Sequence, residues 1–548
     1  MRTSQFVLAA ALAGTFALSD SGRAANPKFF DDDPIARDPE TQDASRVQSI
    51  KSSEQFDFIE NSFLKAGDNS TARAVNVNTI DEVPDSSWFT NRAGTAQWSP
   101  ADATKGPDTG TGPAPGPWTV IEPKTEGVTP GMTIRDSAGV VYFVKFDPPS
   151  NPEMASGAEV VSTKFFHAFG YNVPENYVAM VHRESLTIAP DAQYPDQDGR
   201  LHPMRPADID TLLQRAARSA DGRYRALVSK ALVGKPVGNF RYYGTRPDDP
   251  NDIHPHEHRR ELRGLVVFAS WLNHDDSRSI NTLDTIVSEG TRSIVRHHLI
   301  DFGSTLGSGS TQAQSTRAGN EFIWESRPTL ITMLTLGLYV RPWVKFEYPD
   351  YPSIGRFEGN YFLPESWKPE YRNPAFSNAR PDDRFWAARI LAAVPDDTVR
   401  RIVETAKYSD PRAAQYLVET LLVRKSKVLT AWLNGINPIV NPALSDSGVL
   451  TFENAAERAG VASAAERYTV EWLRFDNASG AQEAAGDETT VTEPRAQAPV
   501  SLLGAKPQFV AARVRGFHPD RPAWAQPVML YFRQVDGRWK LVGLERNP

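Results

Sequence analysis

The sequence contains no cysteine among its 548 residues. This absence excludes disulfide bonds, cysteine-ligated zinc, iron–sulfur clusters, cysteine nucleophiles and a lipid anchor on an N-terminal cysteine. An excess of positive charge is also absent, because 60 Lys and Arg residues face 67 Asp and Glu residues, for a net charge of −7. A negative balance argues against a general nucleic-acid-binding protein, so we expect no nucleic-acid partner.

Long apolar runs are scarce, and the one that stands out is FVLAAALAGTFAL at residues 6–18. It is too short to span a bilayer comfortably. It follows Arg2 and precedes Gly22 and Ala24, a pair of small residues that suits a cleavage site. We therefore expect a signal peptide over residues 1–25, with a buried N-terminal helix as the alternative. We also expect no transmembrane segment in the mature chain, and a periplasmic or secreted location.

The length predicts roughly three or four domains, at about 150 residues per domain. We expect an N-terminal arm and Gly/Pro linker over residues 26–117, a first lobe with an insertion over 118–245, and a second lobe over 246–440. A C-terminal extension with a small β module is expected over 441–548. Within the arm, the stretch 101–117 is rich in Gly, Pro and Thr and is expected to hold neither a helix nor a central strand.

Alternating apolar residues bounded by turn residues predict strands along the chain. These segments are 118–124, 132–136, 140–146, 294–300, 509–517 and 528–544. Asp536-Gly537 predicts a hairpin turn inside the last of them. The low-complexity Ala/Glu/Thr/Pro segment 478–500 is expected to be a loop or linker.

Apolar residues at helical spacing predict helices over 257–272 and within 381–435. Another helix follows the third predicted strand. Ser150 or Asn151 would cap it and Gly170 would end it.

Three features that suit phosphoryl transfer follow one another along the chain. Lys145 lies in the predicted strand VYFVKF, and the next helix carries Glu159. The loop HDDSRSIN then presents Asp276 five residues before Asn281, and a later strand ends in Asp301. Phosphoryl transfer needs a cation on the phosphates, a carboxylate that holds this cation, and an Asp that orients or deprotonates the acceptor hydroxyl. It also needs Asn and Asp oxygens for a divalent metal.

The order of these motifs resembles the protein-kinase-like superfamily. Residues 274–281, His-Asp-Asp through Asn, match H-x-D-x-x-x-x-N, and Asp301-Phe302-Gly303 matches D-F-G. The divergent N-terminal motifs are more similar to atypical kinases, such as HipA-like or secretory-pathway kinases, than to the eukaryotic core. The resemblance covers about residues 118–435.

The resemblance implies an α+β, two-lobed protein-kinase-like fold, here with an N-terminal arm and a small C-terminal β module. It implies that Lys145 binds the phosphates of ATP, that Glu159 pairs with Lys145, and that Asp276 is the catalytic base. Asn281 and Asp301 would bind Mg²⁺ or Mn²⁺.

The sequence departs from the family pattern at several positions. The loop 125–131, which would cover the phosphates, has only Gly127 and Gly131 in place of G-x-G-x-x-G. Asp275 stands where the catalytic triplet of kinases has Arg, and it remains an alternative for the base. No A-P-E motif follows D-F-G at a sensible distance.

The expected activity is transfer of the ATP γ-phosphate to a hydroxyl of an unknown protein or glycan acceptor, in an exported protein. Two alternatives remain open: a catalytically inactive pseudokinase that acts as a binding or scaffold protein, and nucleotidyl transfer from the same cleft. The residues match no P-loop, no H-E-x-x-H and no G-x-S-x-G, so other common enzyme classes find no support.

Three further features have competing interpretations. Glu153 rivals Glu159 as the partner of Lys145, but it lies at the start of the helix and should point to solvent. The alternating histidines of residues 254–258 would suit a metal, yet Pro255 interrupts them and a structural or solvated role is expected. Three arginines are expected to form a solvated helix face, with an acceptor-binding patch as the alternative: Arg259, Arg260 and Arg263.

Overall fold

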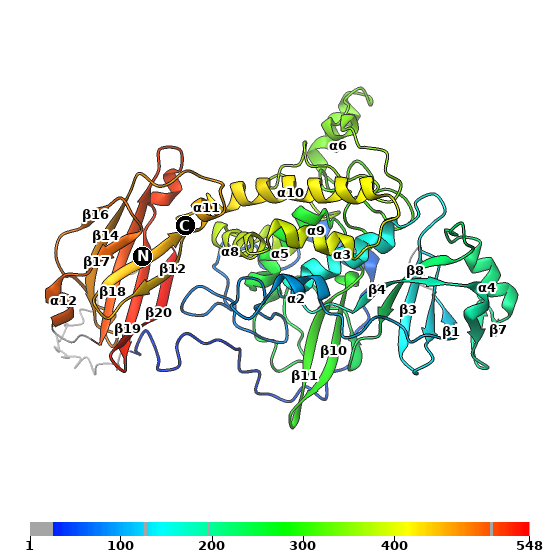
Figure 1. Cartoon of the computed structure of the whole chain (residues 1–548), viewed down its shortest axis with the longest axis horizontal. Helices are drawn as coiled ribbons and strands as arrows, with labels where there is room; N and C mark the ends of the chain where they lie inside the picture. Colours follow the sequence, from blue (N-terminus) through cyan, green and yellow to red (C-terminus); the bar gives the residue numbers. More distant parts are fainter. Residues whose placement is uncertain (1–25, 125–128, 196–197, 505–507, 547–548) are drawn as a thin grey trace, which may run out of the picture.

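The structure is a computed structural model that describes residues 26–124, 129–195, 198–504 and 508–546. The molecule is elongated, with a sheet-rich lobe at one end, a helical lobe in the middle and a β module at the other end (Figure 1). The expectation of an α+β fold with two lobes, an arm and a C-terminal β module is confirmed. The expected signal peptide 1–25 and Gly127 lie outside the described residues.

The first lobe is built on a six-stranded sheet in the order β4-β8-β3-β2-β1-β5. Its strands are β1 Trp118–Pro123, β2 Gly131–Arg135, β3 Val141–Phe146, β4 Asn176–Val181, β5 Leu186–Ile188 and β8 Tyr224–Lys230. In β3 every second residue from Tyr142 is buried, so Lys145 lies on the opposite face. An insertion adds β6 Gln193–Pro195, β7 Leu201–Pro203 and α4 Pro206–Leu213.

Helix α3, Met154–Ala168, has apolar or small residues on nearly all sides and is buried along almost its whole length. It begins later than predicted, because residue 153 takes a left-handed conformation and acts as the N-cap in place of Ser150 or Asn151. The backbone N–H of Ser156 is satisfied by Asp147 Oδ1 at 2.9 Å. Gly170, at φ 110°, follows the end of the helix as predicted.

The second lobe surrounds α5, Arg260–Leu272, and contains the sheet of β9 Lys235–Gly238, β10 Thr282–Glu289 and β11 Arg292–Leu299. The predicted helices of residues 381–435 are confirmed. The helices of this lobe also include α6 and α7, and the bounds are α6 Ser326–Leu334, α7 Pro374–Ser377, α8 Pro381–Ala392, α9 Asp396–Glu404 and α10 Pro411–Leu433.

The expected solvated arginine face on α5 is wrong. Arg259, Arg260 and Arg263 are all buried, the last two at 0% exposure. Carboxylates from the arm and from the start of α8 hold Arg260, which meets both Asp81 and Asp383. These partners lie far away in the sequence, which is why the local pattern gives a wrong answer.

The arm, residues 26–117, wraps the second lobe and contains α1 Glu54–Ile59, a following π-helical turn and α2 Pro100–Lys105. The expectation that no helix forms in 101–117 is therefore wrong at its start. Ser99 and Asp102 form a reciprocal capping box there, with Pro100 at the first helical position.

The C-terminal module contains a three-stranded and a larger sheet. Its strands are β12 Ile439–Leu444, β13 Val449–Asn454, β14 Arg467–Phe475, β15 Gln482–Ala484, β16 Thr489–Val491, β17 Arg495–Gln497, β18 Phe509–Phe517, β19 Val528–Val535 and β20 Arg538–Arg546. Two short helices join them, α11 Ala455–Arg458 and α12 Val500–Gly504. The hairpin turn at Asp536-Gly537 is confirmed, with φ of 49° and 78°. The predicted loop 478–500 is wrong in part, because β15, β16 and β17 pair with longer strands.

Within the described ranges, no helix is both long enough and apolar enough to cross a bilayer.

Candidate active site

Lys145 of β3 meets two carboxylates that come from different parts of the chain. Its Nζ donates to Glu159 Oε2 on α3 at 3.3 Å and to Asp301 Oδ1 after β11 at 2.7 Å. The side chain of Glu159 is 2% exposed, whereas that of Asp301 is 44% exposed. The sequence-predicted Lys, Glu and Asp therefore converge at one place, which is closed on the Glu159 side and open on the Asp301 side.

The ammonium of Lys145 stabilises both carboxylates, whereas the two carboxylates repel each other. Burial alone would lower the pKa of Lys145, but the charges of Asp301 and Glu159 outweigh it and raise this pKa. Burial raises the pKa of Glu159 in spite of the nearby ammonium group. Burial would also raise the pKa of Asp301, yet Lys145 and, less strongly, Lys124 outweigh it and lower this pKa, so Asp301 is ionised at neutral pH.

Asp301 adopts a left-handed backbone conformation, with φ of 58°. Asp tolerates this region better than most residues, but such conformations persist only where the surroundings enforce them. The next residue supplies the constraint, because Phe302 N donates to Glu159 Oε1 at 3.1 Å and its ring stacks on Phe166 of α3 at 4.8 Å. The D-F-G segment is thus held against α3, the helix that carries Glu159.

The predicted catalytic loop lies directly before β10 and is tied to the strand that leads to Asp301. Asn281 Nδ2 donates to the backbone carbonyl of Asp276 at 2.7 Å, and Ile300 N donates to the carbonyl of Asn281 at 3.0 Å. Asp276 forms an ion pair with Arg278. Burial raises the pKa of Asp276 to about 6, although Arg278 opposes this shift.

Asp275, the alternative base, is held differently. It is more deeply buried than Asp276, and Gln314 Nε2 donates to its Oδ1 at 2.8 Å. Burial, followed by the charge of Asp276, raises the pKa of Asp275 to about 8. A carboxyl that is neutral at pH 7 and bonded to a buried amide is a supporting group, so the geometry favours Asp276 for contact with an acceptor.

The donor set fits a hard divalent cation held together with a nucleotide. Asp301 offers an ionised and partly exposed carboxylate, and Asn281 offers an amide oxygen from the neighbouring loop. Mg²⁺ and Mn²⁺ prefer oxygen ligands, and Mg²⁺ usually binds through one or two protein groups plus phosphates. No cluster of three or more His, Asp or Glu side chains suited to a metal occurs within the described residues, so the cation would depend on the nucleotide for ligands.

Gly131 has a structural reason to be glycine. It pairs with Lys145 across β2 and β3, and a Cβ atom at this position would lie 2.3 Å from the carbonyl oxygen of Val144. The close approach of the two strands is enough to require glycine here, and a role of Gly131 at the nucleotide stays a prediction. Lys124, by contrast, was missed by the sequence analysis, although its charge lowers the pKa of Asp301. The sequence did contain a signal for it, because Lys124 is the last residue of the predicted strand 118–124 and directly precedes the loop 125–131.

Glu153 does not compete for Lys145. Its Oε2 accepts from the backbone N–H of Ser409, which belongs to the turn between α9 and α10. The histidines are also accounted for by protein contacts. His256 lies 2.7 Å from Asp252 and His258 lies 3.0 Å from Asp68, which agrees with a structural role.

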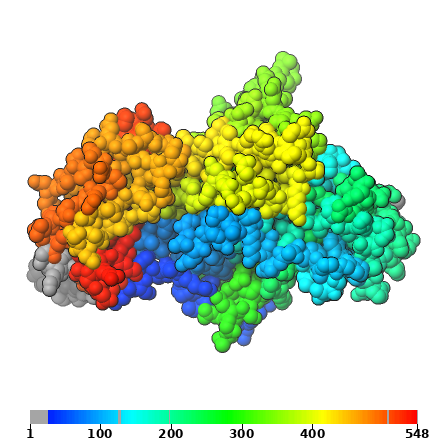
Figure 2. All heavy atoms as spheres, in the orientation of Figure 1, coloured from blue at the N-terminus to red at the C-terminus, as the bar shows by residue number. Residues whose placement is uncertain are grey.

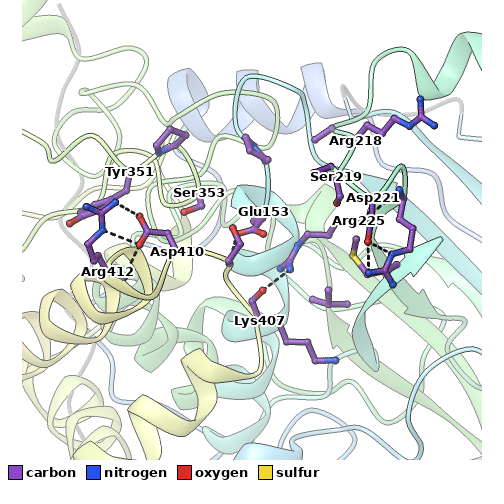
Figure 3. Close-up of a pocket in the computed structure, with 18 of the residues that line it drawn as sticks. Glu153, Arg218, Ser219, Asp221, Arg225, Tyr351, Ser353, Lys407, Asp410 and Arg412 are labelled. Carbon is purple, nitrogen blue, oxygen red and sulfur yellow. Dashed lines mark hydrogen bonds and ion pairs between the residues drawn. The ribbon is translucent and has the colours of Figure 1, made fainter. Parts of the chain in front are cut away.

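A groove of about 1160 Å³ opens at the first turn of α3, between the sheet of the first lobe and the turn before α10. None of the predicted site residues lines it, so it is separate from the lysine site. Arg225 crosses its floor (Figure 3): it donates to Ser156 Oγ at 2.8 Å and to the carbonyl of Lys407 at 3.0 Å. Arg225 therefore joins β8 and α3 to the second lobe.

The comparisons with known proteins give a limited result. No protein-family model matches the sequence, and no curated protein matches it. Among solved structures, the chain is similar to the Helicobacter pylori proinflammatory kinase CtkA at 12% identity, over 54% of this chain and 90% of that one, with a TM-score of 0.28. It is also similar to the Golgi casein kinase at 9% identity, over 73% and 94%, with a TM-score of 0.29. The same kinase with Mn and ADP bound matches at 10% identity, over 72% and 93%, with a TM-score of 0.28. These superpositions are too weak to support roles for individual residues, which rest on the contacts described above.

Proposed function

We propose that this chain is an exported, kinase-like phosphotransferase that moves the γ-phosphate of ATP to a hydroxyl of a protein or glycan, with Mg²⁺ or Mn²⁺. One observation carries the proposal: the ammonium of Lys145 lies 3.3 Å from Glu159 and 2.7 Å from Asp301, and the residue before Asp301 donates to the carbonyl of Asn281 in the predicted catalytic loop. A buried ammonium group with one buried and one solvent-exposed carboxylate partner suits phosphate binding.

Each residue has a defined task in this proposal. Lys145 neutralises phosphate oxygens, and Glu159 fixes the position of its ammonium. Asp301 and Asn281 hold the cation, which would neutralise charge on the transferred phosphoryl group. Asp276 orients the acceptor hydroxyl and takes its proton, a role that its pKa of about 6 permits at neutral pH.

A second candidate, a nucleotide-binding protein without transfer activity, is favoured by one contact. Arg278 pairs with Asp276 and also meets Glu54 at 2.6 Å and Glu370 at 3.5 Å. Transfer requires that an acceptor displace Arg278 from Asp276. A protein that never releases this pair would bind nucleotide without turnover.

The export part of the proposal rests on the apolar residues 6–18. N-terminal sequencing of the exported protein tests this part, because the mature chain should begin near residue 25. A periplasmic kinase would need a source of nucleotide outside the cytoplasm, because ATP is scarce in a bacterial periplasm.

The deciding experiment incubates the purified mature chain with ATP and either Mg²⁺ or Mn²⁺, and follows the protein and candidate acceptors by intact-mass spectrometry. Addition of a phosphoryl group supports phosphotransfer. Addition of an adenylyl group means nucleotidyl transfer from the same cleft. Metal-dependent ATP binding without either product supports the non-catalytic candidate, and the absence of binding contradicts all three.

A further inference from the structure

One segment of the second lobe, residues 326–346, projects from the body as a hairpin (Figures 1 and 2). It consists of α6, a turn at Leu336-Gly337 and a 3₁₀ turn at Pro342–Lys345. Neither helical piece has a buried residue. The exposed fractions of its large apolar residues are high, at 92% for Leu336 and 85% for Leu338. Others on the same hairpin are Leu330, Met333, Leu334, Val340 and Val344.

The root of the hairpin is well built, so the exposed apolar tip does not result from missing structure. Arg341 Nε donates to Glu321 Oε2 at 2.8 Å, and Arg341 Nη1 donates to the carbonyl of Pro328 at 2.8 Å. Trp343 Nε1 donates to the same carboxylate at 3.0 Å. The polar groups of Arg341 and Trp343 are thus paired within the protein, while the leucines at the tip are exposed.

The charges of the hairpin have one sign. Residues 326–346 contain Arg327, Arg341 and Lys345 but no Asp or Glu. Glu321 compensates Arg341, whereas Arg327 and Lys345 form no ion pair with any residue in the described ranges. Aromatic residues accompany the basic ones near the root, namely Trp324, Tyr339 and Trp343. An apolar tip with aromatic and basic residues behind it is the pattern of segments that enter a membrane interface.

We propose that this hairpin binds the surface of a lipid bilayer that contains anionic lipids, with the leucines among the acyl chains and Arg327 and Lys345 at the headgroups. A convex apolar tip needs no partner surface of matching shape in a fluid acyl layer, and the unpaired positive charges match anionic headgroups. The nine residues of α6 extend only about 13 Å at 1.5 Å per residue, against a hydrocarbon core of about 30 Å. The hairpin therefore lies in one interface and does not span the bilayer.

The test is flotation of the full chain with vesicles of phosphatidylglycerol and phosphatidylcholine, compared with vesicles of phosphatidylcholine alone. The wild type should float with the anionic vesicles. The double variant Leu336→Asp/Leu338→Asp should bind them at least about a hundredfold more weakly, because two apolar side chains leave the acyl layer and two negative charges are added. Arg327→Gln/Lys345→Gln should lose about tenfold on the anionic vesicles and change little on the neutral ones.

A matched control is Val233→Asp/Val500→Asp, which adds the same charge at valines that are 78% and 82% exposed outside the hairpin. It should float like the wild type. An equal loss of flotation in this control would overturn the proposal. Unchanged flotation of Leu336→Asp/Leu338→Asp would also overturn it, because residues 1–25 would then be the segment that binds. A dimer in size-exclusion chromatography would also overturn the proposal if the leucine variant abolishes the dimer and no form of the chain binds vesicles. The tip would then dock on a second copy.

Discussion

Two clusters of cations and carboxylates in this molecule differ in whether solvent reaches one of their carboxylates. In the arginine cluster, the guanidinium of Arg260 lies 2.6 to 3.2 Å from three carboxylates, and no member is more than 8% exposed: Asp81, Asp382 and Asp383. In the lysine cluster, Lys145 has one buried partner and one, Asp301, that is 44% exposed. A closed cluster has no position left for a ligand, so it stabilises the fold. An open one retains a charged group that a ligand can reach.

The comparison shows that charge and burial alone do not identify a functional site. Both clusters contain an ionised cation deep in the protein, and in both the carboxylates raise the pKa of that cation. The two clusters differ in one carboxylate, that of Asp301, which is partly exposed and stands on a left-handed backbone. Each of the following predictions tests that distinction.

The largest effect is expected on stability, from Arg260→Met. It leaves three buried carboxylates without their shared cation, and breaking a buried ion pair costs about 3–5 kcal/mol. Urea denaturation should show this loss in the free energy of unfolding. Lys145→Met should cost less than half as much, because water reaches Asp301. Equal losses for both variants would remove the difference between the clusters.

The next largest effect concerns turnover. Asp276→Asn should lower kcat by about 10²–10⁴-fold and leave nucleotide affinity nearly unchanged, because it removes a proton acceptor but no metal ligand. Asp275→Asn should keep most of the activity, since Asp275 is already neutral at pH 7 with a pKa of about 8. Steady-state kinetics on both variants decide which of the two adjacent carboxyls is the base. The reverse result would assign this role to Asp275.

A smaller effect is expected on nucleotide binding. Asp301→Ala should weaken metal-dependent ATP binding by about 10- to 100-fold, the range for a lost bond to a charged group, while the thermal transition stays close to wild type. Asp350→Ala is the matched control, because it removes an exposed carboxylate from the separate groove. Calorimetry that gives the same affinity for Asp301→Ala and the control would show that Asp301 is not a ligand.

The smallest effect is a pH dependence. Asp276 acts as a base only when ionised, and its pKa is raised to about 6, so kcat should rise with pH through about 6 and then level off. Below that value each pH unit should cost about tenfold in rate. Asp301, whose pKa is lowered, stays ionised over this range. The residual activity of Asp276→Asn should lack this step, and a wild-type profile that is flat between pH 5 and 7 would exclude Asp276 as the base.

Local patterns in the sequence predicted much of the fold. The strands β1, β2 and β3, the body of α3 and the hairpin at Asp536-Gly537 depend on residues close together in the chain, so alternation and turn chemistry were sufficient. The meeting of Lys145, Glu159 and Asp301 was predicted from motif order, because a strand lysine, a helix glutamate and an aspartate after a strand imply one cleft. The functional roles of these residues remain predictions.

Long-range contacts account for most of what local patterns did not predict, and one local cap accounts for helix α2. The burial of Arg260 depends on Asp81, which is distant in the chain, and the pairing of Asp276 depends on Arg278 being held by Glu54 of the arm. Helix α2 formed in a Gly/Pro-rich stretch because one capping box at Ser99 outweighed its composition. Composition describes an average, whereas a cap acts at a single residue.

The anchorage of the arm makes the two ends of the chain depend on each other. Phe29 is buried among Phe475, Phe509 and Tyr531 of the C-terminal module, and Lys28 N donates to the carbonyl of Asn477 at 3.0 Å. Further along the arm, Asp57 Oδ1 accepts from the hydroxyl of Ser279, within the predicted catalytic loop, at 3.0 Å.

During folding, therefore, the segment around Phe29 cannot dock until nearly the whole polypeptide has been made, since its docking site is completed by strands near residue 530. The C-terminal module, which carries none of the predicted site residues, would then hold the N-terminal arm in place. Shortening the chain at its far end would loosen the arm and, through Asp57, the predicted catalytic loop.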